Sequence, residues 1–304
     1  ERQAIDDILD ILDGNPQAII LAAGVFQDMS AADLLSALRS RPFDVVGPVR
    51  AAFHVSYERL TQPQQRLFAA LGLFAGPDLS GEAAQSLFDQ DTALDLARLC
   101  GVSLLRRDQA TGRYSLHPLL KEYAKGKLGA PDPLQLRLAA YYSQLTSAHN
   151  QPTEEHLNAI ALDFPNIRGS VEWCIESKGR KAGSSFVDTV IHMVHFMDMR
   201  GYWTERIAWG EAGIDATKSA GDGPRLALIA QHLGIAYRGL GRMDEARASY
   251  EQSLEINRRL DNQTSISGDL HQLGNLAYSQ GHPDEARALY QQSLEIEKRL
   301  GDQQ

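Results

Sequence analysis

Three side chains that can bind a metal ion follow one another at helical spacing in the middle of the sequence. His192, His195 and Asp198 recur every three residues, so a helix would bring all three toward one face. Large apolar residues separate them, including Met193 and Phe196, and this pattern is typical of a helix packed inside a protein. We therefore interpret the triplet as part of a packed helix and predict no metal site.

No other arrangement of residues predicts catalysis. The sequence contains no G-x-x-x-x-G-K-[ST] loop to cradle phosphates and no apolar strand that ends in paired acids to hold magnesium. We see no hydrolase arrangement around Ser103 or Ser115. Cys100 and Cys174 lie among apolar residues and are interpreted as buried free thiols. We predict that this stretch of chain is not an enzyme.

The composition is that of an ordinary soluble protein, with 43% hydrophobic and 23% charged residues among 304. The net charge of −9 argues against nucleic acid or an anionic membrane as partner, because phosphate binding needs a surplus of Lys and Arg. Neither a signal peptide nor a membrane span of ~20 apolar residues is evident, so we expect a cytoplasmic location. Because the chain begins at Glu1 without a Met, we expect a piece of a longer protein.

The strongest organising feature is a repeat with an offset of 40 residues near the C-terminus. Residues 233–260 and 273–300 are identical at 16 of 28 positions. Such self-similarity is typical of stacked helical hairpins, each too small to bury its apolar face alone. Gly201, Gly241 and Gly281 share the spacing and predict a third, degenerate unit upstream, each unit being helix A, a glycine turn and helix B.

These repeats resemble the tetratricopeptide repeat. The motif L-G-x-x-Y-x-x-x-G followed by D-E-A-x-x-x-Y is matched in the first copy, whereas the second copy has Ala277 in place of the first Tyr. The matching residues are Leu233, Gly234, Tyr237, Gly241, Asp244, Glu245, Ala246 and Tyr250. The resemblance implies an α-α superhelix, with the extra residues beyond the usual ~34 extending the helices and the loop between units.

The resemblance also implies that helix A of each unit lines a concave groove. The residues expected to face this groove and to bind a protein or peptide partner are Gln231, Ile235, Arg238, His271, Asn275 and Tyr278. The set is polar, with one aromatic ring and one cation, and suits hydrogen bonding to a peptide. The alternative is a solvated face that binds nothing in this part of the array.

The N-terminal half predicts a different domain. Amphipathic helices are expected at 50–60 and 62–74, and further helices at 81–89 and 92–99. A β-hairpin follows, with its turn at 110–112, and a last helix spans 118–128. This order is that of a winged helix-turn-helix. The predicted fold is therefore mainly α, a winged helix-turn-helix with a small β-hairpin followed by a tetratricopeptide superhelix.

DNA binding by this domain is one interpretation. The helix before the hairpin would enter the major groove, but it carries Asp91 and Asp95, and only Arg98 would favour phosphate. The hairpin adds a modest basic cluster at Arg106, Arg107 and Arg113. Such a cluster more often forms a solvated surface or an intramolecular contact, so we expect nucleic acid not to be the partner.

The N-terminal half also resembles the winged-helix domain of signal-transduction ATPases of the NB-ARC or STAND type, here of the bacterial kind. The similar segments are S-Y-x-x-L from Ser56, Q-x-x-L-F-x-x-L-x-x-F from Gln64, and L-H-P at 116–118, where the family has Met-His-Asp. Residues 12–19 resemble the family's G-x-P element, and 163–173 resemble the segment that joins the winged helix to the repeats.

This resemblance implies two nucleotide contacts. His117 would reach the β-phosphate of bound ADP, and Pro16 would contact the adenine. From the residues alone, His117 can equally cap the helix that begins at Pro118, and Pro16 can equally start a helix. The chain itself implies no cofactor, whereas the full-length parent is expected to bind ADP and ATP and to be the ATPase.

The predicted domains are 1–42, the end of the helical subdomain of the nucleotide-binding module; 43–130, the winged helix; 131–185, a helical linker with or without degenerate repeats; and 186–304, the repeat solenoid. The predicted function is non-catalytic and regulatory. The winged helix would hold the ADP-bound, autoinhibited state against the upstream domain. The repeats would sense a ligand, and the parent would oligomerise on activation. The alternatives are a DNA-binding transcriptional regulator with the repeats as effector sensor, or a plain scaffold.

Overall fold

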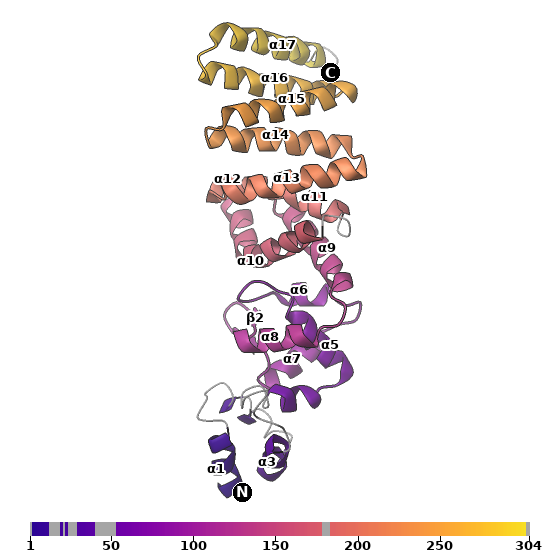
Figure 1. The fold of residues 1–304 in the computed structure, drawn as a ribbon, viewed down its shortest axis with the longest axis vertical. Coiled ribbons are helices and arrows are strands. Elements are labelled where there is room, and N and C mark those ends of the chain that lie inside the picture. Colours follow the sequence, from indigo (N-terminus) through magenta and orange to yellow (C-terminus); the bar gives the residue numbers. More distant parts are fainter. Residues whose placement is uncertain are drawn as a thin grey trace. The chain divides into compact units, whose positions relative to one another are not determined.

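The chain is described by a computed structural model that covers residues 2–11, 19–20, 22–23, 29–39, 53–177 and 183–301. It divides into two compact units, Glu1–Tyr141 with Asp163–Gly169, and Tyr142–Leu162 with Ser170–Gln304. The described residues are mainly helical and include one small antiparallel hairpin, which confirms the predicted class (Figure 1). The four predicted domains and the boundaries between them stay predictions.

The first unit follows the predicted order of helices, hairpin and helix. A helical segment at 53–58 precedes the hairpin and its neighbouring helices. The elements are α1 (Arg2–Ile11), α3 (Ala31–Arg39), α5 (Gln62–Leu71), α6 (Gly81–Gln85), α7 (Ala93–Gly101), β1 (Arg106–Arg107), β2 (Tyr114–Ser115) and α8 (Pro118–Lys127). Classification of this unit as a winged helix stays a prediction.

The hairpin forms for local reasons that the sequence carries. The side chain of Asp108 accepts hydrogen bonds from the backbone N–H groups of Ala110 and Thr111, which closes the turn. Gly112 has a left-handed φ of 71°, a conformation that favours glycine. Arg106 pairs with Ser115, so the turn lies where the sequence predicted it.

Two long helices, α9 (Asp132–Ala148) and α10 (Glu154–Glu176), connect the hairpin-containing part of the chain with the repeats. Pro165 lies inside α10 and removes one backbone donor from its hydrogen-bond ladder. The remaining helices are α11 (Gly183–His192), α12 (Val194–Arg200), α13 (Trp203–Ala220), α14 (Gly223–Gly239), α15 (Met243–Arg259), α16 (Gln263–Ser279) and α17 (Pro283–Gly301).

The array consists of three helix pairs at the predicted offset. The B helices α13, α15 and α17 begin at Trp203, Met243 and Pro283. The A helices are α14, α16 and, in the first pair, α11 and α12, which are separated at Met193. Gly201, Gly241 and Gly281 end the A helices with left-handed φ values of 76°, 73° and 80°. The degenerate upstream unit is therefore a helix pair like the other two.

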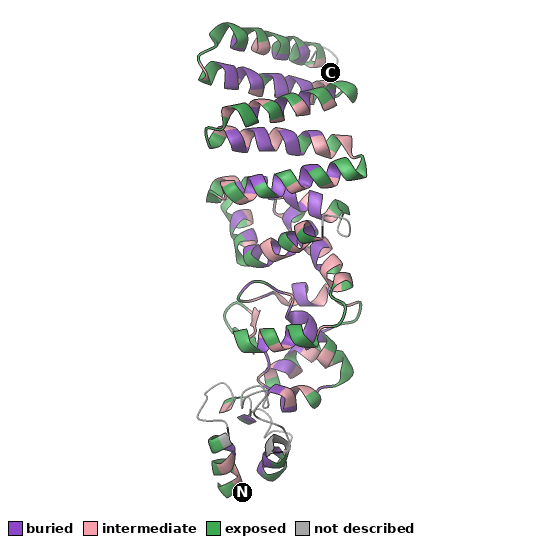
Figure 2. Cartoon of the chain, in the orientation of Figure 1, coloured by how far each residue is buried: buried purple, intermediate pink, exposed green. Residues whose placement is uncertain are grey.

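Buried residues run along the A helices α14 and α16, whereas α17 is largely exposed (Figure 2). Tyr237 of α14 donates a hydrogen bond of 2.6 Å from its hydroxyl to Glu211 of α13, so it joins neighbouring pairs. Burial and this hydrogen bond raise the pKa of Tyr237 to about 12, so it remains a donor at neutral pH. Ala277, its counterpart in the next pair, is fully buried without such a contact.

In the second and third pairs, helices A and B approach closely at a glycine of the A helix. A Cβ atom on Gly234 would lie 2.5 Å from Cε1 of Tyr250, and one on Gly274 would lie 2.6 Å from Cε1 of Tyr290. Tyr250 is fully buried. The tyrosine ring of the B helix therefore lies directly on the backbone of the A helix. No residue larger than glycine fits at that position of the A helix unless the ring moves.

We predict that Gly234→Ala destabilises the array by about 1–3 kcal/mol, because the added methyl group must displace a fully buried ring. Urea unfolding followed by circular dichroism measures the change. Gly268→Ala in α16 is the matched control, since its Cβ would meet only the end of the Gln231 side chain at 3.5 Å. An equal loss in the control would contradict the packing account.

Candidate functional site

The six residues predicted to face a groove lie on helices α14 and α16, and none of them is fully buried. We call this surface the A-helix face, and it comprises Gln231, Ile235, Arg238, His271, Asn275 and Tyr278. The side chains differ in how far they are already engaged by the protein. That difference decides which of them can meet a partner.

Gln231 is held inside the array. Its side-chain amide donates a hydrogen bond of 2.7 Å to Asp269, a buried carboxylate on α16. Asp269 also accepts hydrogen bonds from Ser253 at 2.9 Å and Asn257 at 2.8 Å, both on α15. The three donors carry no charge, and burial raises the pKa of Asp269. Gln231 therefore joins two neighbouring pairs instead of standing free for a ligand.

The residues of α16 are engaged to different degrees. Asn275 accepts a hydrogen bond of 2.8 Å from the Tyr290 hydroxyl, and the ring centroids of His271 and Tyr290 lie 5.4 Å apart. Tyr278 is 70% exposed. Arg238 on α14 is half-buried. Tyr278 is thus the most accessible aromatic group of the A-helix face.

The histidines considered as metal ligands lie on α11 and α12, the A helices of the first pair. His192 and His195 line a cavity of about 330 Å³ together with His232 from α14, a residue that sequence spacing could not connect with them. Asp198 instead forms an ion pair with Arg206, which also donates a hydrogen bond to the backbone oxygen of His232. Within the described residues, no group of three or more His, Cys, Asp or Glu is arranged to hold a metal ion.

Burial governs the charge state of this region. Burial, Arg206 and His195 together lower the pKa of His232 to about 4, so its ring is neutral at physiological pH. Burial raises the pKa of Asp198, whereas Arg206 opposes that rise. The cavity therefore offers the neutral ring of His232 beside the ion pair of Asp198 and Arg206.

His117 is exposed and caps α8, with Nδ1 accepting a hydrogen bond of 3.3 Å from the backbone N–H of Leu119. An Nδ1 that accepts leaves the proton of a neutral ring on Nε2, which can then donate to a ligand. The side chain lines a cavity of about 630 Å³ that also contains Ser103, Arg106 and Arg107. Both sequence interpretations of His117, cap and phosphate donor, are compatible with this geometry.

The second predicted nucleotide contact, Pro16, and nearly all of the segment 12–19 lie outside the described residues. No described helix has the length and apolar character needed to cross a bilayer.

Arg113, one of the three basic residues predicted for the hairpin, is taken up by an internal cluster. It donates hydrogen bonds of 2.6 Å to Asp78 and 2.8 Å to Asp163. Asn166 accepts from the backbone N–H of Gly76 at 2.6 Å and donates to the backbone oxygen of Asp78 at 2.8 Å. Asp163 and Asn166 belong to the segment 163–173, so part of that motif has a structural role that spacing alone did not reveal.

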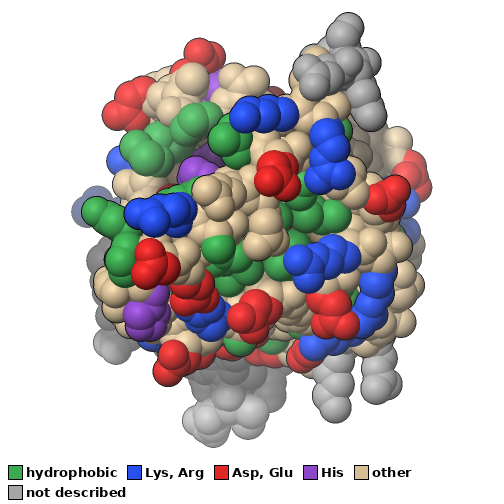
Figure 3. Space-filling view, turned by 90° about the horizontal axis from the view of Figure 1, so that it is seen from above, with side chains coloured by type: hydrophobic (Ala, Val, Ile, Leu, Met, Phe, Trp, Pro, Cys, Tyr) green, Lys and Arg blue, Asp and Glu red, His purple; other side chains and the backbone are tan. Residues whose placement is uncertain are grey.

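This cluster weakens the basic surface expected for DNA binding. Arg107 lies over the ring of Tyr114 at 5.7 Å, and only Arg106 and Arg107 remain of the three hairpin cations. On the face shown in Figure 3, acidic, basic and hydrophobic side chains are interspersed instead of gathering into one basic patch. Neither the described part of the hairpin nor this face offers the row of cations that binding to the phosphates of DNA requires.

Comparison with known proteins identifies the repeats. Residues 221–299 match the family described as tetratricopeptide repeat. The chain is 26% identical over 258 residues to the regulatory protein AfsR of Streptomyces griseus, an alignment covering 75% of this chain and 26% of that protein. It is 32% identical over 197 residues to a putative HTH-type transcriptional regulator of Mycobacterium tuberculosis, covering 57% and 22%. The chain thus spans about a quarter of the length of these curated relatives.

Two solved structures are also similar. One is a Signal Transduction ATPase with Numerous Domains (STAND) protein with a tetratricopeptide repeat sensor from Pyrococcus horikoshii, with 15% identity and a TM-score of 0.38 over 96% of this chain and 50% of that one. The other is BtubC (BKLC) from P. vanneervenii, with 17% identity and a TM-score of 0.36 over 56% and 75%. At these TM-scores neither structure informs on function.

We predict that the pH dependence of stability reports the buried charge of Asp269. Because its folded pKa lies above the unfolded value of ~3.9, the folded state binds the proton more readily, and stability falls as pH rises through the folded pKa. Asp269→Asn lacks this titration. Its free energy of unfolding should therefore improve relative to the natural chain as pH rises from about 4 to about 7. Parallel pH profiles in urea unfolding would show that burial does not perturb the carboxyl group.

We predict that Asp163→Ala destabilises the first unit by about 3 kcal/mol, because the half-buried Arg113 loses one of its two acidic partners among the described residues. Thermal and urea unfolding measure the loss. Asp89→Ala is the control, since its ion pair with Arg137 lies in solvent and its removal should have a much smaller effect. Equal effects of the two substitutions would contradict a structural role for the cluster.

Proposed function

We propose that this chain is the non-catalytic regulatory and interaction region of a STAND-type ATPase. Residues 43–130 are a winged helix that holds the ADP-bound, autoinhibited state, and the tetratricopeptide repeats sense a ligand or protein partner. Two observations support a regulatory role: the repeats at 221–299, and the similarity to AfsR and to a putative HTH-type regulator. The order of motifs along the chain supports the STAND assignment.

The observation that carries the nucleotide part of the proposal is the geometry of His117. Nε2 carries the proton of the neutral ring and is the group that can donate to a phosphate oxygen, beside a cavity that holds Arg106 and Arg107. The sequence has no phosphate loop, so the ADP or ATP itself would be held by the upstream domain of the full-length parent. His117 would then act as a latch: its side chain, on the winged helix, would donate a hydrogen bond to the nucleotide that the upstream domain holds.

The repeats supply the input of such a switch. Tyr278, His271 and Arg238 present an aromatic ring, an imidazole and a cation at the A-helix face, which suits a peptide with hydrogen-bonding and acidic groups. A partner that binds the open state more tightly than the closed state shifts the equilibrium toward opening, nucleotide exchange and oligomerisation.

The test is ADP release from the full-length parent with two substitutions at His117. His117→Asp keeps a strong helix cap but brings a negative charge toward the phosphate, whereas His117→Ala removes both the cap and the donor. We expect both variants to release ADP at least tenfold faster, which corresponds to ~1.4 kcal/mol or more. Stopped-flow fluorescence of a labelled ADP measures the release rate. Thermal unfolding measures how much stability is lost when the helix cap is removed.

His282→Ala, at an exposed histidine on the turn before α17, is the matched control. If His117→Ala lowers thermal stability while both variants retain ADP like the parent, His117 is a helix cap only and the latch is wrong. A nucleotide effect that persists in His117→Asp without loss of stability separates the two roles.

A DNA-binding transcriptional regulator remains the second candidate, because relatives covering 57% of the chain are named as HTH-type regulators. The candidate helix α7 presents Leu94, 85% exposed, between Asp91 and Asp95, a surface poorly suited to phosphate. Duplex binding by the chain with a steep salt dependence would favour this candidate over the latch.

A further inference from the structure

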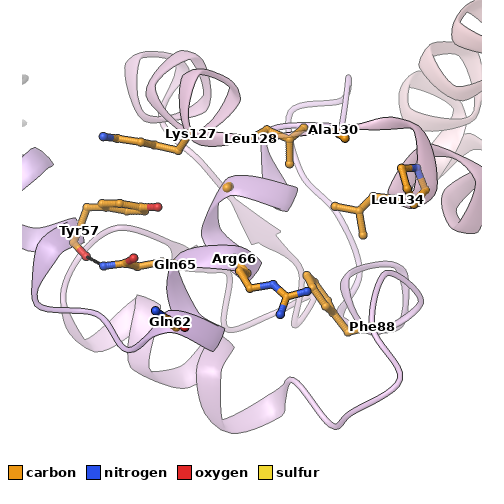
Figure 4. A pocket seen from close by; sticks show the side chains of 12 residues that line it. Tyr57, Gln62, Gln65, Arg66, Phe88, Lys127, Leu128, Ala130 and Leu134 are labelled. Atoms are coloured by element: carbon orange, nitrogen blue, oxygen red, sulfur yellow. Dashed lines mark hydrogen bonds between the residues drawn. The ribbon is translucent and has the colours of Figure 1, made fainter.

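A groove on the first unit contains residues that none of the functions above uses. A cavity of about 490 Å³ adjoins a second of about 560 Å³, and the two share Gln62, Arg66, Phe88, Pro133 and Leu134 in their walls. The first cavity, drawn in Figure 4, is also lined by the end of α8, and the shared residues join the two cavities into one groove along α5 and the start of α9. We call it the α5–α9 groove.

The walls of the first cavity are mainly apolar, whereas those of the second are about equally polar and apolar. Figure 4 shows Tyr57 below Lys127 at one end, and Phe88 with Leu134 toward the other. Leu128 lies between them along the rim. Burial raises the pKa of Tyr57, so its hydroxyl stays protonated. Aromatic and aliphatic walls of this kind favour a hydrophobic side chain as occupant.

Two cations border this apolar surface without a carboxylate partner among the described residues. Lys127 is exposed, and its ammonium lies 5.2 Å from the ring centroids of both Tyr57 and Tyr123, which orients it by cation–π attraction. Arg66 is exposed and extends along the groove toward Phe88 (Figure 4).

Neighbouring basic residues differ from these two. Arg137, in the second cavity, binds Asp89 with hydrogen bonds of 2.8 and 2.9 Å. Lys125 pairs with Glu122 at 3.1 Å. In a chain with a net charge of −9, two cations that lack acidic partners beside an apolar groove provide charge complementarity for an acidic ligand.

We propose that the α5–α9 groove binds an acidic peptide segment of a partner protein, with a hydrophobic side chain between Tyr57 and Leu134 and carboxylates on Lys127 and Arg66. A nucleic acid fits less well, because its phosphates need many cations, whereas this groove offers two without a carboxylate partner among the described residues, and its first cavity is mainly apolar. The groove shares no residue with His117 or the A-helix face. Failure here would therefore leave the proposed function untouched.

The test uses the 304-residue chain and a fluorescent synthetic peptide of glutamate and leucine at helical spacing, followed by fluorescence anisotropy. We expect saturable binding that weakens at least tenfold in Lys127→Glu and in Arg66→Glu, because each substitution replaces an attraction by a repulsion. Leu134→Ser should weaken it as well, through the apolar contact. Circular dichroism confirms that each variant is folded.

Lys125→Glu is the matched control, since it makes the same change in net charge two residues away on α8 and outside the groove. An equal loss of binding in Lys125→Glu would mean nonspecific electrostatics and would overturn the proposal. The same holds if Lys127→Glu and Arg66→Glu bind like the natural chain, if the peptide does not bind at all, or if single-stranded DNA competes as strongly as the unlabelled peptide.

Discussion

The close approach of a B-helix tyrosine to an A-helix glycine holds together two of the three helix pairs in the described part of the array. No pair can bury its apolar face alone, so each must pack both within itself and against the next. Tyr250 on Gly234 makes the first kind of contact, and the Tyr237 hydroxyl on Glu211 makes the second. Glycines with left-handed φ at 201, 241 and 281 follow the A helices at equivalent positions, 40 residues apart. The turn from helix A to helix B is therefore the same in each pair.

That packing also limits which side chains remain for a partner. Asp269 is buried between neighbouring helices and needs three donors, and one of them is Gln231 from the A-helix face. Asn275 is similarly joined to Tyr290. Two of six candidate contact residues therefore stabilise the array, which leaves Tyr278, His271, Arg238 and Ile235 as the groups a ligand can reach most directly.

The first unit shows the same competition between structure and surface. Arg113 forms ion pairs with Asp78 and Asp163. One of the three residues of the predicted basic cluster is therefore neutralised inside the unit. Lys127 and Arg66, beside the α5–α9 groove, have no such acidic partner within the part of the chain that the structure describes. His117 combines both roles in one ring, because Nδ1 caps α8 while Nε2 carries the proton and can donate.

Much of the local structure could be predicted from the sequence, because its causes are local. The repeat offset, the glycine turns, the hairpin turn and the helix at Pro118 all follow from residue type and spacing over a few positions. Contacts between distant residues could not be predicted in this way. His232 beside His192, Arg113 with Asp163, and Gln231 on Asp269 are 40, 50 and 38 residues apart. Only tertiary packing brings such groups together and, by burying some of them and exposing others, decides which polar side chains stabilise the fold and which remain available to bind.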